Sequence, residues 1–345
     1  MPSSGLEREG GRVGIREVAE AAGVSTTTVS HALSGRGKVS AATADRVRTV
    51  AELLGYEPNR LASALRNRRS GVLGFVSDEI ATTPFAGRIV LGAQEAASSA
   101  GMTLMVVNTG RDPVVEARQI EVLRAQQVDA LLYATMFHRI TPAPRGFASG
   151  PVVMVNSSDP DGRSASIVPD ERRIGREATA LLLEAGHRRI VHLTIDEAVP
   201  AVEGRSAGHR EAMVGAGLEP VVVAVEGPGD AAAGRRAMVR ALAAHPDLTA
   251  VFVFNDPMSM GVYQDAFHRG RSVPGDLSVV SVDDLELISA QLLPGLTTFE
   301  LPHYEMGSWA VEQAVNLIGE PGRAASSVSA RCRLVRRGSV ARPRD

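Results

Sequence analysis

The segment from residue 15 to residue 65 constrains the fold most, because it combines apolar helical stripes with turn signals at short spacing. The first stripe has apolar residues at i, i+3, i+4 and i+7, namely Ile15, Val18, Ala19 and Ala22. Gly23 follows and permits the left-handed turn that ends a helix, and Ser25 is a favourable N-cap for the next one. The pattern predicts two helices that cross closely around a tight turn.

The second predicted helix has an apolar side and a polar side. The apolar side carries Val29, Ala32 and Leu33, and the outward side carries Thr26, Thr27, Thr28, Ser30 and His31. A third helix is expected after Ser40, with an inward stripe of Val47, Val50, Ala51 and Leu54. Any small three-helix bundle explains these stripes. The outward face of short hydrogen-bonding groups and one imidazole also suits the major groove of DNA, so we interpret residues 13–58 as a helix-turn-helix DNA-binding domain.

Charge is divided unevenly along the chain. Residues 1–70 contain eleven basic and seven acidic side chains, a net charge of +4, and the remainder has a net charge of −6. A basic head on an acidic body favours the binding of a polyanion at one end. Residues 1–12 are expected to form a disordered N-terminal arm.

Residues 59–70 are expected to form a hinge helix and linker between the head and the body. Pro58 ends the preceding helix, and Asn59 is able to cap a short helix that continues to Leu65. A helix of this length does not persist alone in water. Arginines at 66, 68 and 69 follow it, so a basic interdomain linker is the simpler interpretation of the same residues.

From residue 71 to residue 340, short apolar runs alternate with amphipathic stretches. The apolar runs predict buried strands at 72–76, 103–107, 130–134, 152–155, 190–194, 221–225, 251–254 and 277–282. The amphipathic stretches predict helices at 85–100, 113–126, 171–185, 205–214, 232–245, 257–269 and 303–318. Because crossovers are right-handed, this alternation predicts an α/β core of two doubly wound parallel-sheet subdomains behind the α-helical head.

Polar residues stand where several predicted strands end. They are Asn156, Arg205, Asn255, Asp256, Asp283 and Asp284. In open α/β sheets, ligands bind beyond the carboxyl ends of the strands. Each residue alone is explained by a helix cap or a solvated loop, whereas their recurrence at successive strand ends predicts a ligand-binding cleft.

The residues of the head also carry a family resemblance. The runs VAEAAGVSTTTVSHAL, KVSAATADRV and LGYEPNRLASAL resemble the LacI family of bacterial transcriptional regulators, and the resemblance covers nearly the whole chain. It implies that the helix at 25–34 enters the major groove, and that Leu65 on a hinge helix paired with its twin wedges into the minor groove. The DNA contacts expected on these grounds are Ser25, Thr26, Thr27, Ser30, His31, Lys38, Asn59, Arg60 and Leu65.

The body resembles a type I periplasmic sugar-binding protein, with GHRRI, RSAGH, FVFND and VVSVDD matching family motifs in order. The resemblance implies effector contacts from Arg205, Asn255 and Asp283, with Phe85 and Asn156 beside the cleft. We expect one subdomain at about 71–169 plus 297–325 and the other at about 170–296 plus 326–340.

Three positions depart from the family pattern. His31 stands where many members have arginine, His209 where many have phenylalanine, and Leu301 precedes Pro302 where glutamine is common. Arginine reads guanine through two hydrogen bonds, whereas histidine offers one at a time. We therefore expect a different base preference at one half-site position, and the identity of the effector stays open.

The sequence predicts a cytoplasmic transcriptional regulator, a repressor that binds a palindromic double-stranded DNA operator as a homodimer. A small-molecule effector, a sugar in the first instance, is expected to control its affinity for the operator. The aromatic content of 4% is low for a sugar site, which leaves a nucleoside or a small acid open. The alternatives are a cytoplasmic carbohydrate-processing enzyme and a solute-binding protein with a basic N-terminal arm.

Motifs of catalysis are missing from the sequence, which contains no G-x-S-x-G, P-loop or H-E-x-x-H pattern. We therefore assign no catalytic residue and expect neither a cofactor nor a metal. The single cysteine, Cys332, excludes an internal disulfide and a cysteine-based zinc site. No apolar run has the length of a transmembrane helix, and no association with a membrane is expected.

His31 provides a direct test of the DNA-contact assignment. The His31→Ala variant is expected to lose discrimination at one base position of each half-site, by about 1–3 kcal/mol, because the imidazole no longer bonds to a base edge. Operator binding measured against a panel of single-base substitutions checks this. Unchanged discrimination at every base would contradict the assignment.

Overall fold

The computed structural model describes residues 13–34, 37–56, 69–80, 87–144, 146–147 and 150–344, and the chain divides into two compact units after residue 70. The first unit, the head, contains α1 (Ile15–Ala22), α2 (Thr26–Ser34) and α3 (Ala41–Leu53). Gly23 makes the turn after α1 with a φ of 63°. The hydroxyls of Ser25 and Ser40 cap α2 and α3, accepting backbone N–H groups at 3.1 and 3.2 Å. The predicted helix-turn-helix is confirmed.

One valine from each helix fills the centre of the head. Val18, Val29 and Val47 are fully buried, and each contributes about 1.5–3 kcal/mol through removal of apolar surface from water. The prediction that Leu54 packs inward is wrong, since Leu54 caps the C-terminus of α3 and is 38% exposed. The apolar stripe is longer than the helix that carries it.

The second unit, the body, contains two six-stranded sheets. The first sheet has the order β11-β5-β4-β3-β1-β2, with β1 (Val72–Ser77), β2 (Thr103–Asn108), β3 (Ala130–Ile140), β4 (Val152–Ser158), β5 (Ala165–Pro169) and β11 (Ser327–Ala330). The second has the order β12-β10-β9-β8-β6-β7, with β6 (Ile190–Ile195), β7 (Val221–Val225), β8 (Ala250–Val253), β9 (Ser278–Asp283), β10 (Thr297–Glu300) and β12 (Arg333–Val335). Every described pairing is parallel except β10 with β12, which confirms the predicted fold class.

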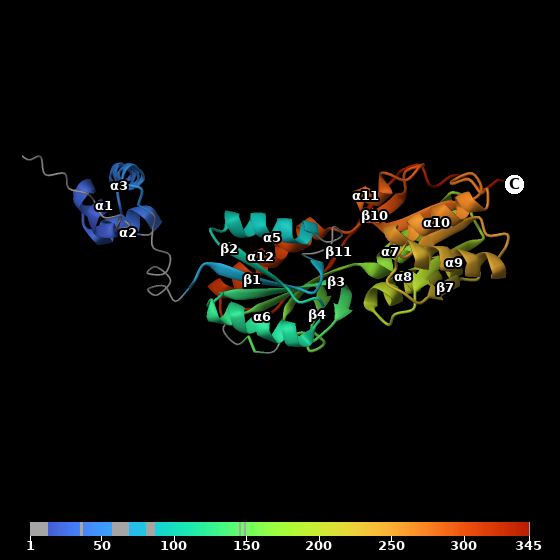
Figure 1. Ribbon diagram of the computed structural model, residues 1–345, viewed down its shortest axis with the longest axis horizontal. Helices are drawn as coiled ribbons and strands as arrows, with labels where there is room; N and C mark the ends of the chain where they lie inside the picture. Colours follow the sequence, from blue (N-terminus) through green and yellow to red (C-terminus); the bar gives the residue numbers. More distant parts are fainter. Residues whose placement is uncertain are drawn as a thin grey trace, which may run out of the picture. The chain divides into compact units, whose positions relative to one another are not determined.

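Helices cover both faces of each sheet (Figure 1). They are α5 (Gly87–Ser99), α6 (Pro113–Ala125), α7 (Glu171–Glu184), α8 (Pro200–Gly215), α9 (Ala231–Ala244), α10 (Asp256–His268), the short α11 (Glu286–Ser289) and α12 (His303–Gly319). The pair α5–α12 packs on one face of the first sheet and α6 on the other, while α7–α8 and α9–α10 cover the two faces of the second. Central strands are therefore buried on both sides, which explains their continuous apolar sequence.

None of the helices in the described ranges is long and apolar enough to span a membrane.

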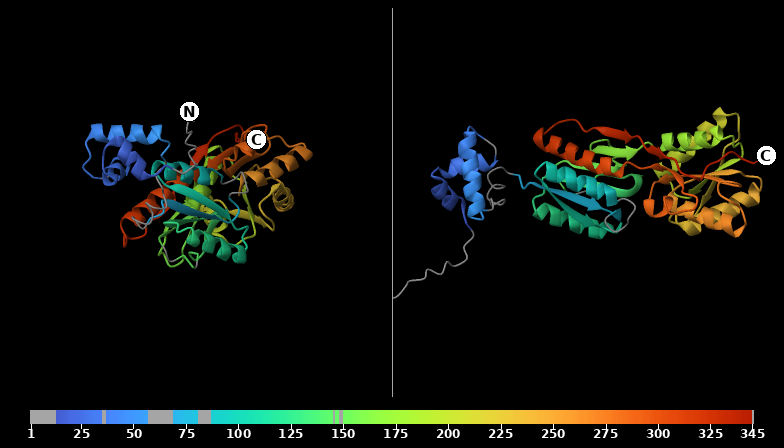
Figure 2. Two further views of the ribbon diagram at one scale, coloured as in Figure 1. Left: turned by 60° about the vertical axis from the view of Figure 1, so that its left-hand side comes forward. Right: turned by 90° about the horizontal axis from the view of Figure 1, so that it is seen from above.

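The chain passes between the two sheets three times. It crosses from β5 to α7, from β10 to α12 and from β11 to β12. The right-hand view of Figure 2 shows the two sheets, each with its own helices, as two lobes of the body that lie side by side. These crossings shift two boundaries expected from the sequence: β10 lies in the second sheet rather than the first, and β11 lies in the first rather than the second.

Four strands had no sequence-based prediction, namely β5, β10, β11 and β12. Each has only three to five residues, and β11 and β12 are edge strands with exposed side chains. β5 and β10 are mostly buried but too short to give a recognisable apolar run, and β11 and β12 have no such run at all. The strand predicted at 130–134 continues to Ile140 as β3, with an irregular register between Ala134 and Arg139 where it pairs with β4.

Reciprocal glycines bring the paired helices into backbone contact. A Cβ atom on Gly175 of α7 would lie 2.0 Å from the carbonyl oxygen of Arg205, and one on Gly208 of α8 would lie 2.0 Å from that of Arg172. The same arrangement joins α5 to α12 through Gly92 and Gly307, and α9 to α10 through Gly234 and Gly261. Only glycine permits these approaches, because the opposing atoms belong to the backbone.

Replacement of Gly175 by alanine is expected to destabilise the protein by about 1–3 kcal/mol, because the added methyl group collides with a backbone that cannot yield. Gly215→Ala on α8 is the matched control: nothing lies within 4 Å of its added Cβ, so the change is expected to be neutral or stabilising by up to about 1 kcal/mol. Denaturant unfolding followed by circular dichroism measures both. Equal effects of the two variants would contradict the close-contact interpretation.

Candidate functional site

The polar face of α2 is accessible to a partner. Thr26, Thr27 and His31 are exposed, as is Lys38 beyond the helix, and Ser30 is half-buried. Thr27 and His31 lie one helical turn apart and so share a face. The hydroxyl of Ser25 accepts the Thr28 N–H and lies 2.9 Å from the Thr28 hydroxyl, so this serine also holds the start of the helix.

The imidazole of His31 lies against the backbone of Gly37. Gly37 has a φ of +90°, and a Cβ there would stand 2.6 Å from His31 Nδ1. A side chain at position 37 would therefore be strained and would displace the ring. Gly37 thus leaves space for the one imidazole on the polar face of α2.

The hinge helix at 59–65 and the predicted contacts Asn59, Arg60, Leu65 and Phe85 lie outside the described residues. They stay predictions.

The body has a narrow cleft where the two sheets meet. Its lining is Met136, Phe137, His138, Asn156, Glu171, Ala201, Arg205, Phe254, Asn255, Asp283 and Leu301. The structure thus brings together Asn156 from β4, Arg205 from α8, Asn255 at the start of α10 and Asp283 at the end of β9. Asn156, Asn255 and Asp283 stand at or near strand ends as expected, whereas the expectation for Arg205 is wrong, since α8 begins at Pro200 and Arg205 lies in its second turn. The free space is about 10 Å³, enough for a single water molecule.

A buried ion pair forms the floor of the cleft. Arg205 Nε donates to Glu171 Oε2 at 2.7 Å, and both side chains are about 95% buried. Arg205 Nη1 donates to the Phe254 carbonyl at 2.5 Å, and its guanidinium lies 4.7 Å from the centre of the Phe254 ring. His138 Nδ1, from β3 of the first sheet, lies 3.9 Å from Glu171 Oε1. Glu171 therefore lies within ion-pairing distance of side chains from both halves of the body, His138 on β3 and Arg205 on α8.

Three buried polar atoms on the cleft lining have no hydrogen-bond partner among the residues that the structure describes. They are His138 Nδ1, Asn156 Oδ1 and Asp283 Oδ2. Asn156 is held by its amide nitrogen, which donates to the carbonyls of Thr135 and Met136, both at 3.0 Å. An unpaired buried polar atom costs about 1–3 kcal/mol, so three at one place indicate a site whose partners come from a ligand.

Backbone strain accompanies the unpaired atoms. Asn156 and Asp283 both have positive φ, at 54° and 129°, and Asp284 follows with a φ of 54°. Asparagine tolerates the left-handed region, whereas an aspartate at a φ of 129° is strongly disfavoured. The strained residues lie at the carboxyl ends of β4 and β9, where the chain turns toward the cleft.

Two neighbouring carboxyl groups retain protons more readily than usual. Burial raises the pKa of Asp283 well above its usual range, and the nearby Asp256 adds to the effect. Burial likewise raises the pKa of Asp256 to about 7, although the hydroxyl of Thr298 and the N–H of Leu285 each donate to it at 2.8 Å. Burial also lowers the pKa of His138, against the attraction of Glu171.

The two body positions that depart from the family pattern have different environments. Leu301 lines the cleft as an apolar wall. His209 is fully buried away from the lining, with its Nδ1 2.9 Å from the Thr179 hydroxyl and its ring 5.7 Å from that of His192. His209 therefore belongs to the packing of α8 and not to the cleft surface.

Sequence reasoning missed His138 and Glu171 in the cleft. Glu171 follows Asp170, the N-cap of α7, and so resembles an ordinary acid at a helix start. His138 lies beyond the apolar run that defined its strand. Asn255 was found, and it also caps α10 by accepting the Met258 N–H at 2.9 Å. In the described part of the chain, no three His, Cys, Asp or Glu side chains are placed to hold a metal.

Comparison with family models identifies both units. Residues 14–59 match the model of bacterial regulatory proteins, lacI family, and residues 179–340 match a periplasmic binding protein-like domain. A helix-turn-helix head joined to a body of this kind defines a class of DNA-binding transcriptional regulators.

Similar proteins agree with this class. The ribose operon repressor of Escherichia coli (strain K12) is 33% identical over 331 residues, 94% of this chain and 99% of its own. The HTH-type transcriptional regulator CelR of Thermobifida fusca is 34% identical over 304 residues, 84% of this chain and 87% of its own. The chain belongs to the LacI family and is a DNA-binding transcriptional regulator.

Solved structures of the same architecture include complexes with DNA and with small molecules. The lac repressor dimer bound to operator and the anti-inducer ONPF has a TM-score of 0.76 at 25% identity and covers 96% of this chain and 100% of that one. A CelR–cellobiose complex has a TM-score of 0.69 at 29% identity and covers 95% of this chain and 100% of that one.

His209 makes the stability depend on pH. Burial lowers the pKa of its imidazole from 6.5 to about 4, so between these values the unfolded chain binds a proton that the folded chain does not. Stability therefore falls as the pH falls from about 6.5, by about 3 kcal/mol from this group at pH 4. His209→Phe is expected to remove that loss, while Thr179 keeps its 2.8 Å bond to the Gly175 carbonyl.

Denaturant unfolding at pH 7.5 and pH 4.5 measures the difference, with exposed His268→Phe as the control. The His209 interpretation fails if the unfolding free energies of the variant and the parent protein decline in parallel.

Proposed function

We propose that this regulator is a repressor whose affinity for a palindromic operator is set by a sugar or related polyhydroxyl effector bound in the cleft. The observation that carries the proposal is the convergence around one cavity of three buried polar atoms, on His138, Asn156 and Asp283, that have no hydrogen-bond partner among the described residues. A ligand with several hydroxyl groups supplies hydrogen-bond partners to all three at once.

The chemistry of the cleft favours an uncharged effector. The guanidinium of Arg205 is already compensated by Glu171 and bonded to the Phe254 carbonyl, so a ligand carboxylate would find no uncommitted cation among the described lining residues. Asn156 Oδ1 accepts from a hydroxyl, and the carboxyl of Asp283 either accepts or donates according to its protonation. Phe137 and Phe254, with ring centres 6.4 Å apart, offer apolar faces to the ring of a sugar. The sugar ligand and sugar operon in the names of two relatives are consistent with this class.

In the head, the proposed base contacts come from Thr26, Thr27 and His31, which are exposed on one side of α2. We propose that Ser25, Ser30 and Lys38 support them, and that Asn59, Arg60 and Leu65 complete the contacts from the hinge. Short hydroxyl groups fit the major groove, and Lys38 suits a phosphate.

We propose a homodimer, since a two-fold protein matches a palindromic site. The related lac repressor is a dimer on its operator. Exposed apolar side chains on the edge of the first sheet support a contact there: Leu91 on α5, Val106 on β2 and Val114 on α6 are 47%, 38% and 75% exposed. An apolar patch beside an open strand edge is typical of an interface.

The mechanism proposed is a relative movement of the two halves of the body. About 10 Å³ of free space admits no sugar, so the effector enters only if the sheets separate and re-close. The three crossing segments act as the hinge, and β1, which starts directly after the linker, passes the movement toward the head. The pairing of short hinge helices would then be lost and the operator released. A differential affinity of about 3 kcal/mol changes binding more than a hundredfold.

The effector is expected to bind reversibly and to leave the cleft without chemical change. Its place of action is the bacterial cytoplasm, where the operator DNA lies.

Asp283→Ala tests the proposal. The variant is expected to bind effector about 10- to 100-fold more weakly, because a charged or strong hydrogen bond is lost, and to keep its affinity for operator DNA in the absence of effector. Glu219→Ala, an exposed acid of the same half of the body, is the control. A thermal-shift screen of sugars, nucleosides and small carboxylic acids identifies the effector, and operator titration with and without it measures control.

Asp283→Asn serves as a second variant if alanine impairs folding. An effector that binds both variants as tightly as the parent protein, or that leaves operator affinity unchanged, would overturn the proposal.

A further inference from the structure

A second pocket lies in the second half of the body, at the ends of the strands opposite to the cleft. Its lining residues precede the strands: His187 stands before β6, Leu248 and Thr249 before β8, and the segment from Gly270 to Asp276 before β9, with Pro343 and Arg344 closing one side. The cavity volume is about 420 Å³, in the range of small-molecule sites. The effector cleft lies at the carboxyl ends of the strands, where ligands usually bind in such sheets. This pocket lies at their amino ends and has no lining residue in common with the cleft.

Most polar groups on the pocket lining already have partners. His187 Nδ1 lies 2.9 Å from the Thr249 hydroxyl and its Nε2 lies 2.9 Å from the Ala341 carbonyl. Asp276 accepts the N–H and the hydroxyl of Ser272 at 2.8 and 2.6 Å and pairs with Arg344 Nη1 at 3.0 Å. These bonds define the walls and leave few groups for a ligand.

The lining itself has two arginines, Arg271 and Arg344, and two aspartates, Asp247 and Asp276, and Arg189 beside the lining adds one positive charge. Asp247 is compensated by Arg189 at 3.3 Å and Asp276 by Arg344 at 3.0 Å. Arg271 has no carboxylate within ion-pairing distance in the described part of the chain, although it lowers the pKa of Asp276 from a longer range, after the Ser272 bonds and Arg344. The guanidinium of Arg271 is therefore the uncompensated cation.

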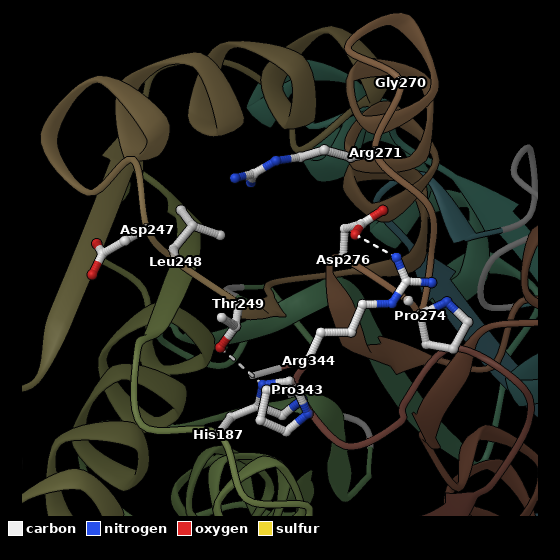
Figure 3. Close-up of a pocket in the computed structure, with 11 residues that line it drawn as sticks. His187, Asp247, Leu248, Thr249, Gly270, Arg271, Pro274, Asp276, Pro343 and Arg344 are labelled. Carbon is white, nitrogen blue, oxygen red and sulfur yellow. Dashed lines mark hydrogen bonds and ion pairs between the residues drawn. The ribbon is translucent and has the colours of Figure 1, made fainter.

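The guanidinium of Arg271 makes one hydrogen bond to the described part of the protein. Its Nη2 donates to the Pro246 carbonyl at 3.1 Å, whereas its buried Nη1 has no partner among the described residues. Figure 3 shows Arg271 reaching across the pocket on the side of Leu248, while Arg344 turns toward Asp276. Gly275 leaves room for Arg344, since a Cβ there would stand 2.7 Å from Arg344 Nη2.

We propose that this pocket binds a small oxyanion, a phosphate or carboxylate group of a metabolite, through the guanidinium of Arg271 with Arg344 as the second contact. A planar guanidinium presents paired N–H groups that match such oxygens in charge and geometry. The anion compensates the positive charge of Arg271 from the pocket side of its guanidinium. The site is independent of the effector cleft and adds a second class of ligand, an anion, to a protein whose cleft favours a neutral one.

The experiment is a calorimetric titration of the full chain with inorganic phosphate and, separately, with acetate, against sodium chloride at matched ionic strength. Arg271→Gln is expected to weaken binding at least 10-fold, because glutamine carries no charge and lacks the guanidinium donors. Arg118→Gln, an exposed arginine on α6 of the other sheet, is the control and is expected to bind as the parent protein does. Circular dichroism confirms that each variant is folded.

Asp283→Ala is expected to leave phosphate binding unchanged, which separates this site from the cleft. Phosphate bound tighter than acetate assigns a phosphate-bearing ligand, and the reverse assigns a carboxylate. Binding no stronger than that of chloride for both anions, or equal binding by Arg271→Gln and the parent protein, overturns the proposal, since anions held by the basic head do not depend on Arg271.

Discussion

The ion pair between Arg205 and Glu171 is the interaction on which the cleft depends. Either charge alone would be costly at this depth, because a buried ion without a partner destabilises a protein by several kcal/mol. Together they join the start of α7 to the middle of α8, and the Phe254 carbonyl and ring complete the environment of the guanidinium. The reciprocal glycines of α7 and α8 allow the two helix backbones to touch, which sets the spacing that the ion pair requires.

Three polar groups that folding leaves without a hydrogen-bond partner in the described part of the chain line the cleft where the two sheets meet. Most buried polar atoms in a folded protein have partners, yet His138, Asn156 and Asp283 each keep one unpaired atom in the same cavity. Asp283 adds a disfavoured backbone conformation and a carboxyl that resists ionisation. The packing of the fully buried strands β6, β8 and β9 offsets the free-energy cost of these unpaired and strained groups. Local destabilisation of this kind is expected at a binding site.

Those parts of the structure that depend on long apolar runs could be predicted from the sequence, and those that depend on short or polar segments could not. Strands such as β8 and β9 are buried on both faces, so their sequences identify them, and polar residues at or just beyond their carboxyl ends, Asp283 and Asn255, fall in the cleft. The edge strand β11 pairs with a segment more than 150 residues away and has no pattern of its own. Glu171 and His138 belong to the cleft only because the chain crosses between the sheets, which no local pattern reveals.

The exchange of strands near the C-terminus has a consequence for biosynthesis. The first sheet receives its edge strand β11 from residues 327–330, and the second receives β12 from residues 333–335. Neither half of the body is complete while these residues are still inside the ribosome. The head precedes the body in the chain, so all of its helices have emerged by then. A nascent chain of this protein therefore displays a finished DNA-binding module before it has a finished regulatory one, and a stop codon shortly before β11 would remove an edge strand from both sheets at once.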